Sequence, residues 1–294
     1  MIQPRENPII MKLNKSMFEY LRKPGFNRLV NIFDQYNFKL IIAGGAVRDL
    51  LLKLKPEDVD FATDATVDEM KAMFSRNEWI ELLERRGEEH GTVTAKMNPS
   101  EIYAITTLKI NNAFKDNKWK MDASRRDFTI NSMFLDLEGN VYDYFNGYKD
   151  LKKKKVVFVG EPIDRIREDY LRIFRYFRFQ GSFAEHPNYL YNNEAISAIK
   201  ETISGLSLIH GSRIWSEWKK ILMGKYGCEL TLKLIECGIA PYCGLPDHPN
   251  TEEFKIAYRD SISRGEIEPL ELIYSLLRTQ SDVSSIQKRL HISF

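Results

Sequence analysis

The pattern of apolar and polar positions changes along the chain near residue 149. Before this point, short apolar runs bounded by glycine, proline and polar residues predict strands over 40–43, 79–83, 92–97 and 102–108. Helical spacing and capping-box patterns predict helices over 16–35, 46–54 and 66–75. Beyond residue 149 the strand signals largely stop and helical periodicity takes over. The sequence therefore predicts an α+β domain over 12–149 and an all-α half over 150–294.

The stretch 41–63 joins a predicted strand, a glycine pair and a predicted helix. A Cβ atom would obstruct the turn at Gly44 and Gly45, and backbone N–H groups at such a turn bind anions. Arg48 adds a guanidinium fork that suits phosphate. The chain then becomes extended, so Asp58 and Asp60 point to the same face of a strand. Two carboxylates on one face repel each other unless a cation lies between them, and Mg²⁺ takes carboxylate and phosphate oxygens as ligands.

Each of these signals also has an ordinary structural interpretation. A single D-x-D pattern is usually solvated surface, and a single glycine pair is usually a turn. In this chain a phosphate-binding turn precedes a carboxylate pair in a strand–turn–helix–strand context. The order of the two signals favours nucleotidyl transfer with Mg²⁺.

A second motif follows a polar stretch at 110–120 that predicts a loop. Arg125 and Asp127 belong to the run R-R-D-F-T-I-N, which ends at Asn131 and leads into an apolar segment. A charged helix start would explain such a run. A functional interpretation is that adjacent arginines and an acid bind the triphosphate and the ribose hydroxyls of a nucleotide.

A third motif lies in a helix predicted over 168–179. Arg172, Arg175 and Arg178 recur every three residues after Asp169, so they form one polar ridge on a largely apolar helix. Buried arginines need partners, and a structural network of arginines and acids is one interpretation. The functional interpretation is that Asp169 and Arg172 offer acceptors and donors to the edge of a nucleobase. Nine Lys or Arg against four Asp or Glu over 151–181 form a local basic patch suited to nucleic acid.

The composition limits the class of protein. With 294 residues, 43% of them hydrophobic and 29% charged, the chain is an ordinary globular protein long enough for two domains. It has no apolar run near the length of about 18 residues that a membrane span requires. Three cysteines without C-x-x-C spacing argue against a disulfide framework and for a reducing compartment. The first fifteen residues contain few acids, so a mitochondrial leader is an alternative to a cytoplasmic location.

The three motifs in this order resemble the signature of the class II tRNA nucleotidyltransferases, the CCA-adding enzymes, and of bacterial poly(A) polymerases. The matching patterns are G-G-x-V-R-D and D-x-D within 44–60, R-R-D-x-T-I-N at 125–131 and E-D-x-x-R at 168–172. The run R-I-W-x-E-x-x-K at 213–220 resembles the family's supporting motif, and 86–92 resembles its R-G-x-x-H-G-T turn. The resemblance covers roughly 12–290. It implies a polymerase-β-like nucleotidyltransferase domain with a mixed sheet, followed by an all-helical RNA-binding half.

The resemblance also implies an activity, which is template-independent addition of C, C and A to the 3′ end of a tRNA from CTP and ATP. Asp58 and Asp60 would be the catalytic residues and would hold two Mg²⁺ ions. Asp169 and Arg172 would select the base, and the tRNA acceptor stem would be the partner. The nucleotide-binding residues implied by the resemblance are Gly44, Gly45, Arg48, Arg125, Asp127, Asn131, Asp169, Arg172, Arg175 and Arg178.

The chain departs from the family pattern in three places. Many relatives carry a further carboxylate just before the I-T-T-L-[RK] strand, where this chain has Ala104, so we expect metal binding by Asp58 and Asp60 without Glu101. The loop over 109–119 is short, which leaves a CC-adding enzyme as an alternative. The chain stops at Phe294, where relatives continue, so it is either a trimmed chain or a compact enzyme that relies on the acceptor stem. A compact enzyme would tolerate tRNAs with reduced arms. The same motifs would also fit a poly(A) polymerase, and an inactive relative that only binds RNA stays open as well.

Overall fold

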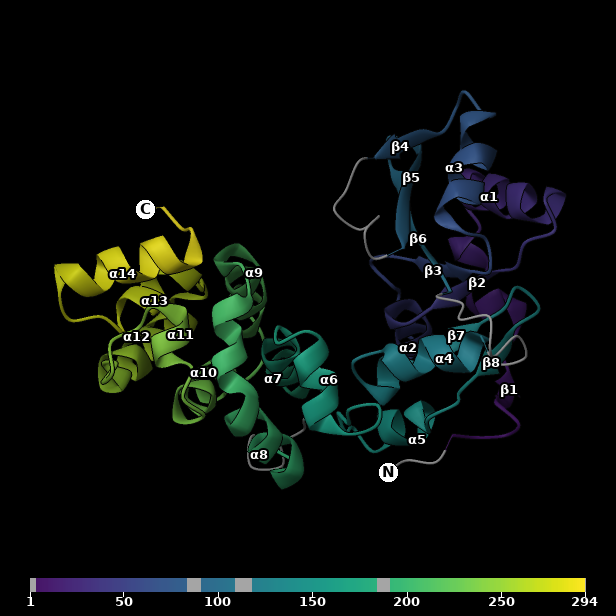
Figure 1. Cartoon of the computed structure of the whole chain (residues 1–294). Coiled ribbons are helices and arrows are strands. Elements are labelled where there is room, and N and C mark those ends of the chain that lie inside the picture. Colours follow the sequence, from purple (N-terminus) through teal and green to yellow (C-terminus); the bar gives the residue numbers. More distant parts are fainter. Residues whose placement is uncertain (1–3, 84–90, 109–117, 184–190, 294) are drawn as a thin grey trace. The chain divides into compact units, whose positions relative to one another are not determined.

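The chain folds into two compact units (Figure 1). The computed structural model describes residues 4–83, 91–108, 118–183 and 191–293. The first unit comprises residues 1–153 and the second residues 154–294. The described part of the first unit mixes strands and helices, and that of the second contains helices only, so the predicted fold class is confirmed. The domain limits near residue 149 stay a prediction.

The first unit is built on a mixed sheet. Among the described residues the sheet has eight strands in the order β1-β8-β7-β2-β3-β6-β5-β4. Neighbouring strands are antiparallel except β3 and β6, which are parallel. The strands are β1 (Ile9–Lys12), β2 (Leu40–Ala43), β3 (Asp60–Thr63), β4 (Glu81–Leu83), β5 (Thr92–Asn98), β6 (Glu101–Thr107), β7 (Phe134–Leu135) and β8 (Asn140–Tyr142).

Aromatic side chains fill the core between this sheet and two of the helices. The ring of Phe26 lies 5.4 Å from that of Phe61 and 6.3 Å from that of Tyr103, measured between centroids. Phe61 is fully buried on this face, and alternation along a strand directs the preceding Asp60 to the opposite face. The helices of the first unit are α1 (Pro24–Gln35), α2 (Gly45–Leu51), α3 (Val67–Ser75), α4 (Lys118–Arg125) and α5 (Gly147–Lys152).

Most element types in the first unit follow the sequence pattern, and the main exception is the start of the first helix. The strand predicted over 40–43 is β2, and the capping box predicted at Thr66 and Glu69 opens α3. The helix predicted from residue 16 begins at Pro24 instead, after two short 3₁₀ helices, Lys15–Met17 and Glu19–Leu21. Proline has a fixed φ and no N–H, so it fits the first turn of a helix and not its interior.

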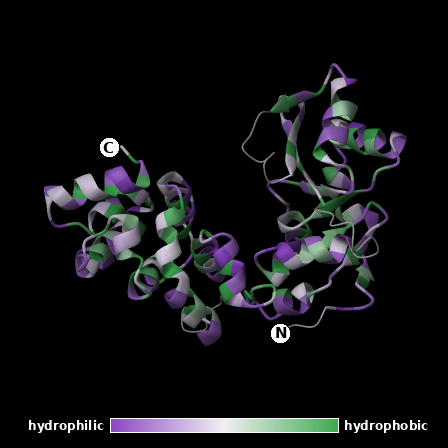
Figure 2. Ribbon diagram, viewed as in Figure 1, coloured by the Kyte–Doolittle hydropathy of each residue, from purple (hydrophilic) through white to green (hydrophobic). Residues whose placement is uncertain are grey.

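In the second unit, helices pack around a second aromatic core. Each helix carries both hydrophobic and hydrophilic residues (Figure 2). Phe174 lies against Trp218 with ring centroids 5.8 Å apart. None of the helices in the described part of the chain is long and apolar enough to cross a bilayer. The helices are α6 (Pro162–Glu168), α7 (Arg172–Phe183), α8 (Asn193–Thr202), α9 (Gly211–Leu222), α10 (Gly227–Glu236), α11 (Ala240–Cys243), α12 (Thr251–Arg264), α13 (Pro269–Tyr274) and α14 (Gln280–Leu290).

The single helix predicted over 168–179 was wrong, because the chain breaks between α6 and α7. Asp169 has φ −155° and ψ 105°, an extended conformation. Its Oδ1 accepts the backbone N–H of Leu171 at 3.1 Å. An aspartate that bonds the backbone in this way competes with helical hydrogen bonding and starts a new helix.

Candidate active site

The strand β2 ends at a turn that glycine alone fits without strain. Gly44 has φ 69° and ψ −125°, a conformation that residues with a Cβ rarely adopt. Its N–H donates to the carbonyl oxygen of Met133 at 3.0 Å. A Cβ atom on Gly44 would lie 3.3 Å from Nη1 of Arg126. The turn therefore lies directly against the segment that carries the second motif.

The two candidate catalytic carboxylates lie where β3 begins. Asp60 is the first residue of β3, whereas Asp58 precedes the strand, so the strand starts later than predicted. Both residues are exposed, but the protein around Asp60 is dense enough to raise the pKa of its carboxyl by desolvation. The guanidinium of Arg126 lowers this pKa, and the charge of Asp58 raises it. The two carboxylates therefore interact electrostatically, beside a guanidinium.

A hydrogen-bond network joins the first motif to the second. Nη1 of Arg48 donates to Oδ1 of Asn131 at 2.8 Å, across 83 residues of sequence. Nδ2 of Asn131 donates to Oδ1 of Asp127 at 3.1 Å. Arg48 also forms an ion pair with Asp49 at 2.8 Å, and its own side chain is only 14% exposed. Three predicted residues thus come together, and the guanidinium of Arg48 holds the second motif in place.

Arg126 belongs to this site, although sequence reasoning included it only in the arginine pair and assigned Arg125 individually. Its Nε and Nη2 donate to Oδ2 of Asp122 at 3.0 and 2.8 Å. Its guanidinium carbon lies 5.7 Å from the centroid of the Phe134 ring. Arg125, the predicted nucleotide-binding neighbour, ends α4 and is exposed. The four-residue spacing of Asp122 and Arg126 on a helix would have identified the pair.

The position beside Asp60 on the neighbouring strand is Ala104, because these two residues are in register across the parallel pair β3–β6. Glu101, on the same strand, is buried. Its carboxylate accepts the N–H of Phe26 at 3.2 Å and the hydroxyl of Tyr103 at 2.8 Å. Glu101 therefore ties β6 to the first turn of α1 and belongs to the core.

The residues expected to select the base lie on either side of the break between α6 and α7. Oδ2 of Asp169 accepts from Nη2 of Arg213 at 3.0 Å. Nη1 of Arg172 donates to Oε2 of Glu168 and to the carbonyl oxygen of Arg165, both at 2.8 Å. Each side chain is thus oriented by partners on a neighbouring turn or helix. Asp169 therefore lies in the break, whereas the arginines of the predicted ridge stay together on α7.

The remaining two arginines of the third motif pack on the surface of α7. The guanidinium carbons of Arg175 and Arg178 lie 5.5 and 4.6 Å from the ring centroid of Phe179. Nε of Arg178 forms an ion pair with Oε2 of Glu217 at 3.1 Å, and the Glu217 side chain is only 8% exposed. Glu217 belongs to the run predicted to support the third motif. This contact favours bracing, rather than phosphate binding, as the role of Arg178.

Two predicted features lie wholly or partly outside the described residues. The turn over 86–92 is described only from Gly91 onward. The loop predicted over 110–120 is described only from Lys118 onward, where the chain is already helical, so the loop prediction was wrong for its last three residues.

The residues beside the glycine turn suit a hard divalent cation. Asp58 and Asp60 supply carboxylate oxygens, and Mg²⁺ commonly takes one or two protein carboxylates together with phosphate oxygens of a substrate. Across the described parts of the chain, no three or more His, Cys, Asp and Glu side chains are grouped so that they could hold a metal ion. A cation held by Asp58 and Asp60 alone would take its remaining ligands from substrate and water.

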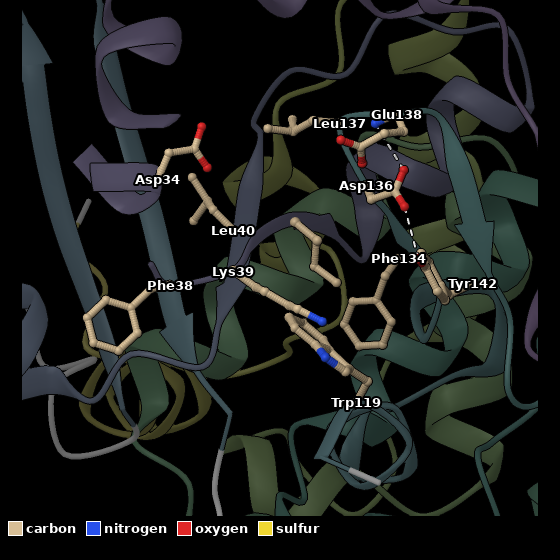
Figure 3. A pocket seen from close by; sticks show the side chains of 11 residues that line it. Asp34, Phe38, Lys39, Leu40, Trp119, Phe134, Asp136, Leu137, Glu138 and Tyr142 are labelled. Atoms are coloured by element: carbon tan, nitrogen blue, oxygen red, sulfur yellow. Dashed lines mark hydrogen bonds between the residues drawn. The ribbon is translucent and has the colours of Figure 1, made fainter. Parts of the chain in front are cut away.

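A cavity of about 370 Å³ opens at the end of β2 that lies away from the glycine turn. Trp119 and Phe134 form an aromatic wall with ring centroids 5.5 Å apart, and Lys39 points toward them (Figure 3). None of the predicted nucleotide-binding residues lines this cavity. It shares Phe134 with the surroundings of Arg126.

Known proteins resemble this chain over most of its length. The family described as "Poly A polymerase head domain" matches residues 40–157. The human protein "CCA tRNA nucleotidyltransferase 1, mitochondrial" is 44% identical over 303 residues, a match that covers 99% of this chain and 68% of the relative. Its mouse counterpart is 45% identical over 292 residues, covering 96% of this chain and 66% of the relative. The chain thus spans about two thirds of the length of these relatives.

Solved structures share the fold. The Thermotoga maritima CCA-adding enzyme complexed with tRNA superimposes with a TM-score of 0.76 at 21% identity, covering 97% of this chain and 70% of that one. The Bacillus stearothermophilus CCA-adding enzyme in complex with CTP gives a TM-score of 0.64 at 26% identity, covering 92% of this chain and 70% of that one. The resemblance drawn from the three motifs is therefore confirmed. The chain belongs to the CCA tRNA nucleotidyltransferase family.

Proposed function

We propose that this chain adds the terminal C, C and A to the 3′ end of tRNA from CTP and ATP, without a nucleic-acid template. The observation that carries the proposal is the network of Arg48, Asn131 and Asp127, because it joins the glycine turn to the nucleotide-binding motif. The identity of 44–45% to relatives named CCA tRNA nucleotidyltransferase supports it over nearly the whole chain.

The catalytic chemistry belongs to the first unit. This family generally uses a divalent metal, and we assign Asp58 and Asp60 as the residues that would hold Mg²⁺. When bound, Mg²⁺ lowers the pKa of the primer 3′-OH and offsets the charge of the triphosphate. The 3′-OH gives up its proton to solvent and its oxygen forms a bond to the α-phosphorus, while the bond from that phosphorus to the pyrophosphate oxygen breaks. Catalysis then consists of positioning and charge neutralisation, with no covalent enzyme intermediate.

The protein's own side chains position the nucleotide. Arg125 and Arg126 bind the triphosphate, next to the backbone of the glycine turn. The carboxylate of Asp127 accepts a ribose hydroxyl, and Asn131 fixes the orientation of that carboxylate through its hydrogen bond. The role of Asn131 is therefore to position, since its amide is shared between Arg48 and Asp127.

Base selection belongs to the second unit. Asp169 offers acceptors and Arg172 offers donors to the edge of cytosine or adenine. Arg213 and Glu168 hold these two side chains in their orientations through charged hydrogen bonds, which are shorter and stronger than neutral ones.

The experiment that tests the proposal is incubation of a tRNA lacking its CCA end with CTP and ATP, followed by sequencing of the product. A product that gains C, C and A and then stops supports the proposal. A product that stops after two C residues identifies a CC-adding enzyme, the possibility suggested by the short loop over 109–119.

A poly(A) polymerase is the second candidate, because the matching family is described as a poly(A) polymerase head domain. A tail of A residues formed from ATP alone would establish this second candidate. We further propose a mitochondrial location, since the human and mouse relatives are named as mitochondrial. Fractionation of cells expressing the tagged chain tests this location.

A further inference from the structure

Small side chains surround Asp60 on the face of the sheet that it shares with its neighbours. Asp60 is in register with Ala43 on β2 and with Ala104 on β6. Ala104 is in turn in register with Thr94 on β5. Residues directly opposite each other on adjacent strands, about 4.8 Å apart, share a face of the sheet. The positions from which a neighbouring strand could supply another metal ligand are therefore filled by methyl groups and one hydroxyl.

Glu101, the one carboxylate on β6, cannot take the place of a residue at 104. The two positions are three residues apart on a strand, so their side chains point to opposite faces. The Glu101 carboxylate is enclosed by donors from Phe26 and Tyr103, and a Cβ atom at Gly25 would lie only 2.7 Å from its Oε2. Turning it toward Asp60 would leave these buried donors without an acceptor.

A guanidinium also weakens the attraction of this site for a cation. Arg126 interacts electrostatically with Asp60 and is fixed near the glycine turn by its two hydrogen bonds to Asp122. In the free protein the negative charge of Asp58 and Asp60 is therefore partly offset before any metal binds. A nucleoside triphosphate would add several negative oxygens and would engage this same guanidinium.

We infer that the free protein binds a divalent cation only weakly, and that the metal enters together with the nucleoside triphosphate, with Ala104 as the residue that sets this dependence. The inference rests on the proposed function, because it takes Asp58 and Asp60 as the metal ligands. Mg²⁺ retains several waters and binds through one or two carboxylates plus substrate phosphates, which is the ligand set that this site offers. A carboxylate at position 104 would complete the site in the absence of nucleotide.

The test measures metal binding directly, by electron paramagnetic resonance titration of Mn²⁺ with the nucleotide-free protein. We expect the wild-type dissociation constant to be weaker than about 100 μM, in the range of weak carboxylate sites. Ala104→Glu and the shorter Ala104→Asp should each tighten binding by at least about tenfold, because charge and ligand number control the affinity of such sites. Equilibrium dialysis should show that CTP raises the amount of Mn²⁺ held on the wild-type protein.

Two control variants distinguish metal binding by a carboxylate at position 104 from effects of side-chain size or of added charge. Ala104→Gln has the size of the glutamate variant without its charge and should leave Mn²⁺ affinity unchanged. Ile102→Glu adds the same charge at an exposed position on the same face, one pleat further along β6 and beside Lys96, and should also leave it unchanged. Circular dichroism verifies that each variant is folded.

Three results would overturn the inference. These are wild-type binding tighter than about 100 μM without nucleotide, no tightening in either carboxylate variant at 104, and equal tightening in Ile102→Glu. Failure of the inference can be distinguished from failure of the proposed function. A protein that adds CCA but binds Mn²⁺ tightly when free would refute the inference alone, whereas the expected binding without any nucleotide incorporation would refute the function alone.

Discussion

The buried carboxylate of Glu101 is a structural group, and Glu101→Gln tests this assignment. The carboxylate accepts hydrogen bonds from the N–H groups of Gly25 and Phe26, from the Tyr103 hydroxyl and from the Asn98 amide. A glutamine at this position presents one acceptor oxygen and one NH₂ group, so at least one buried donor faces another donor. A buried donor without an acceptor costs about 1–3 kcal/mol, and we expect a loss of about 2–4 kcal/mol in the free energy of unfolding.

Urea unfolding followed by circular dichroism measures this loss. With a slope of about 2 kcal/mol per molar urea, the midpoint should fall by about 1–2 M. Hydrogen exchange measured by mass spectrometry should show faster exchange in α1, because the N–H of Phe26 in its first turn loses its carboxylate acceptor. Glu81→Gln is the matched control, since Glu81 pairs with Lys96 at an exposed position and its loss should cost less than about 1 kcal/mol. Wild-type stability in Glu101→Gln, or a loss of Mn²⁺ binding in the presence of CTP, would refute the structural assignment.

The same contact predicts a dependence on pH. Burial alone would raise the pKa of Glu101, but hydrogen bonds from Asn98, Tyr103, Gly25 and Phe26 outweigh it and lower the pKa. A carboxyl whose pKa is lower in the folded state stabilises the protein above its unfolded pKa, which is about 4.3 for glutamate. The difference in stability between wild type and Glu101→Gln should therefore be constant at neutral pH and should shrink as the pH falls below that value. A difference that grew on acidification would contradict the stated cause.

Three further changes probe the proposed site. Asp60→Ala should abolish nucleotide incorporation while leaving tRNA binding in a gel-shift assay intact. Intact tRNA binding would show that the loss of incorporation is not caused by misfolding. An active variant would refute the assignment of Asp60 as a metal ligand. Gly44→Ala imposes a φ of 69° on alanine and brings a methyl group 3.3 Å from Nη1 of Arg126. It should therefore cost about 1–3 kcal/mol of strain and reduce nucleotide incorporation. Unchanged kinetics would contradict the role of the turn. Arg213→Ala removes the 3.0 Å hydrogen bond that orients Asp169, so the ratio of kcat/KM for CTP to kcat/KM for UTP should fall about tenfold. An unchanged ratio would show that the backbone contact of Asp169 is enough to hold it.

The strand β2 and the turn that follows it were predictable, because strand periodicity and the conformational effects of glycine and proline depend on only a few neighbouring residues. Sequence reasoning identified β2 by its apolar run and the turn at Gly44 by its glycine pair. It missed the start of α1 because a capping box at residue 16 was weighed above Pro24, which bars a continuous helix. It placed Asp58 on the strand because an extended chain does not reveal where pairing with a neighbour begins.

Partners distant in sequence account for the remaining differences. The resemblance predicted that the run beginning at Arg213 supports the third motif, but no local pattern indicates that the chain would break at Asp169. Arg126 was not assigned individually, although its spacing from Asp122 is local, because its proximity to the glycine turn depends on how the sheet is assembled. Motif order was therefore a better guide to the family than to the geometry of individual side chains.

The contact between Arg48 and Asn131 spans 83 residues, and this separation has a consequence for synthesis of the chain. Ribosomes add about 5–20 residues per second, so about 4–17 s pass between the emergence of the arginine and that of its amide partner. During that interval a nascent chain carries the glycine pair and both aspartates but lacks the segment that becomes β7, which pairs with β2. The network around Arg48 can therefore be completed only late in translation of the first unit, and a polypeptide that ends before residue 131 has the glycine motif without this network.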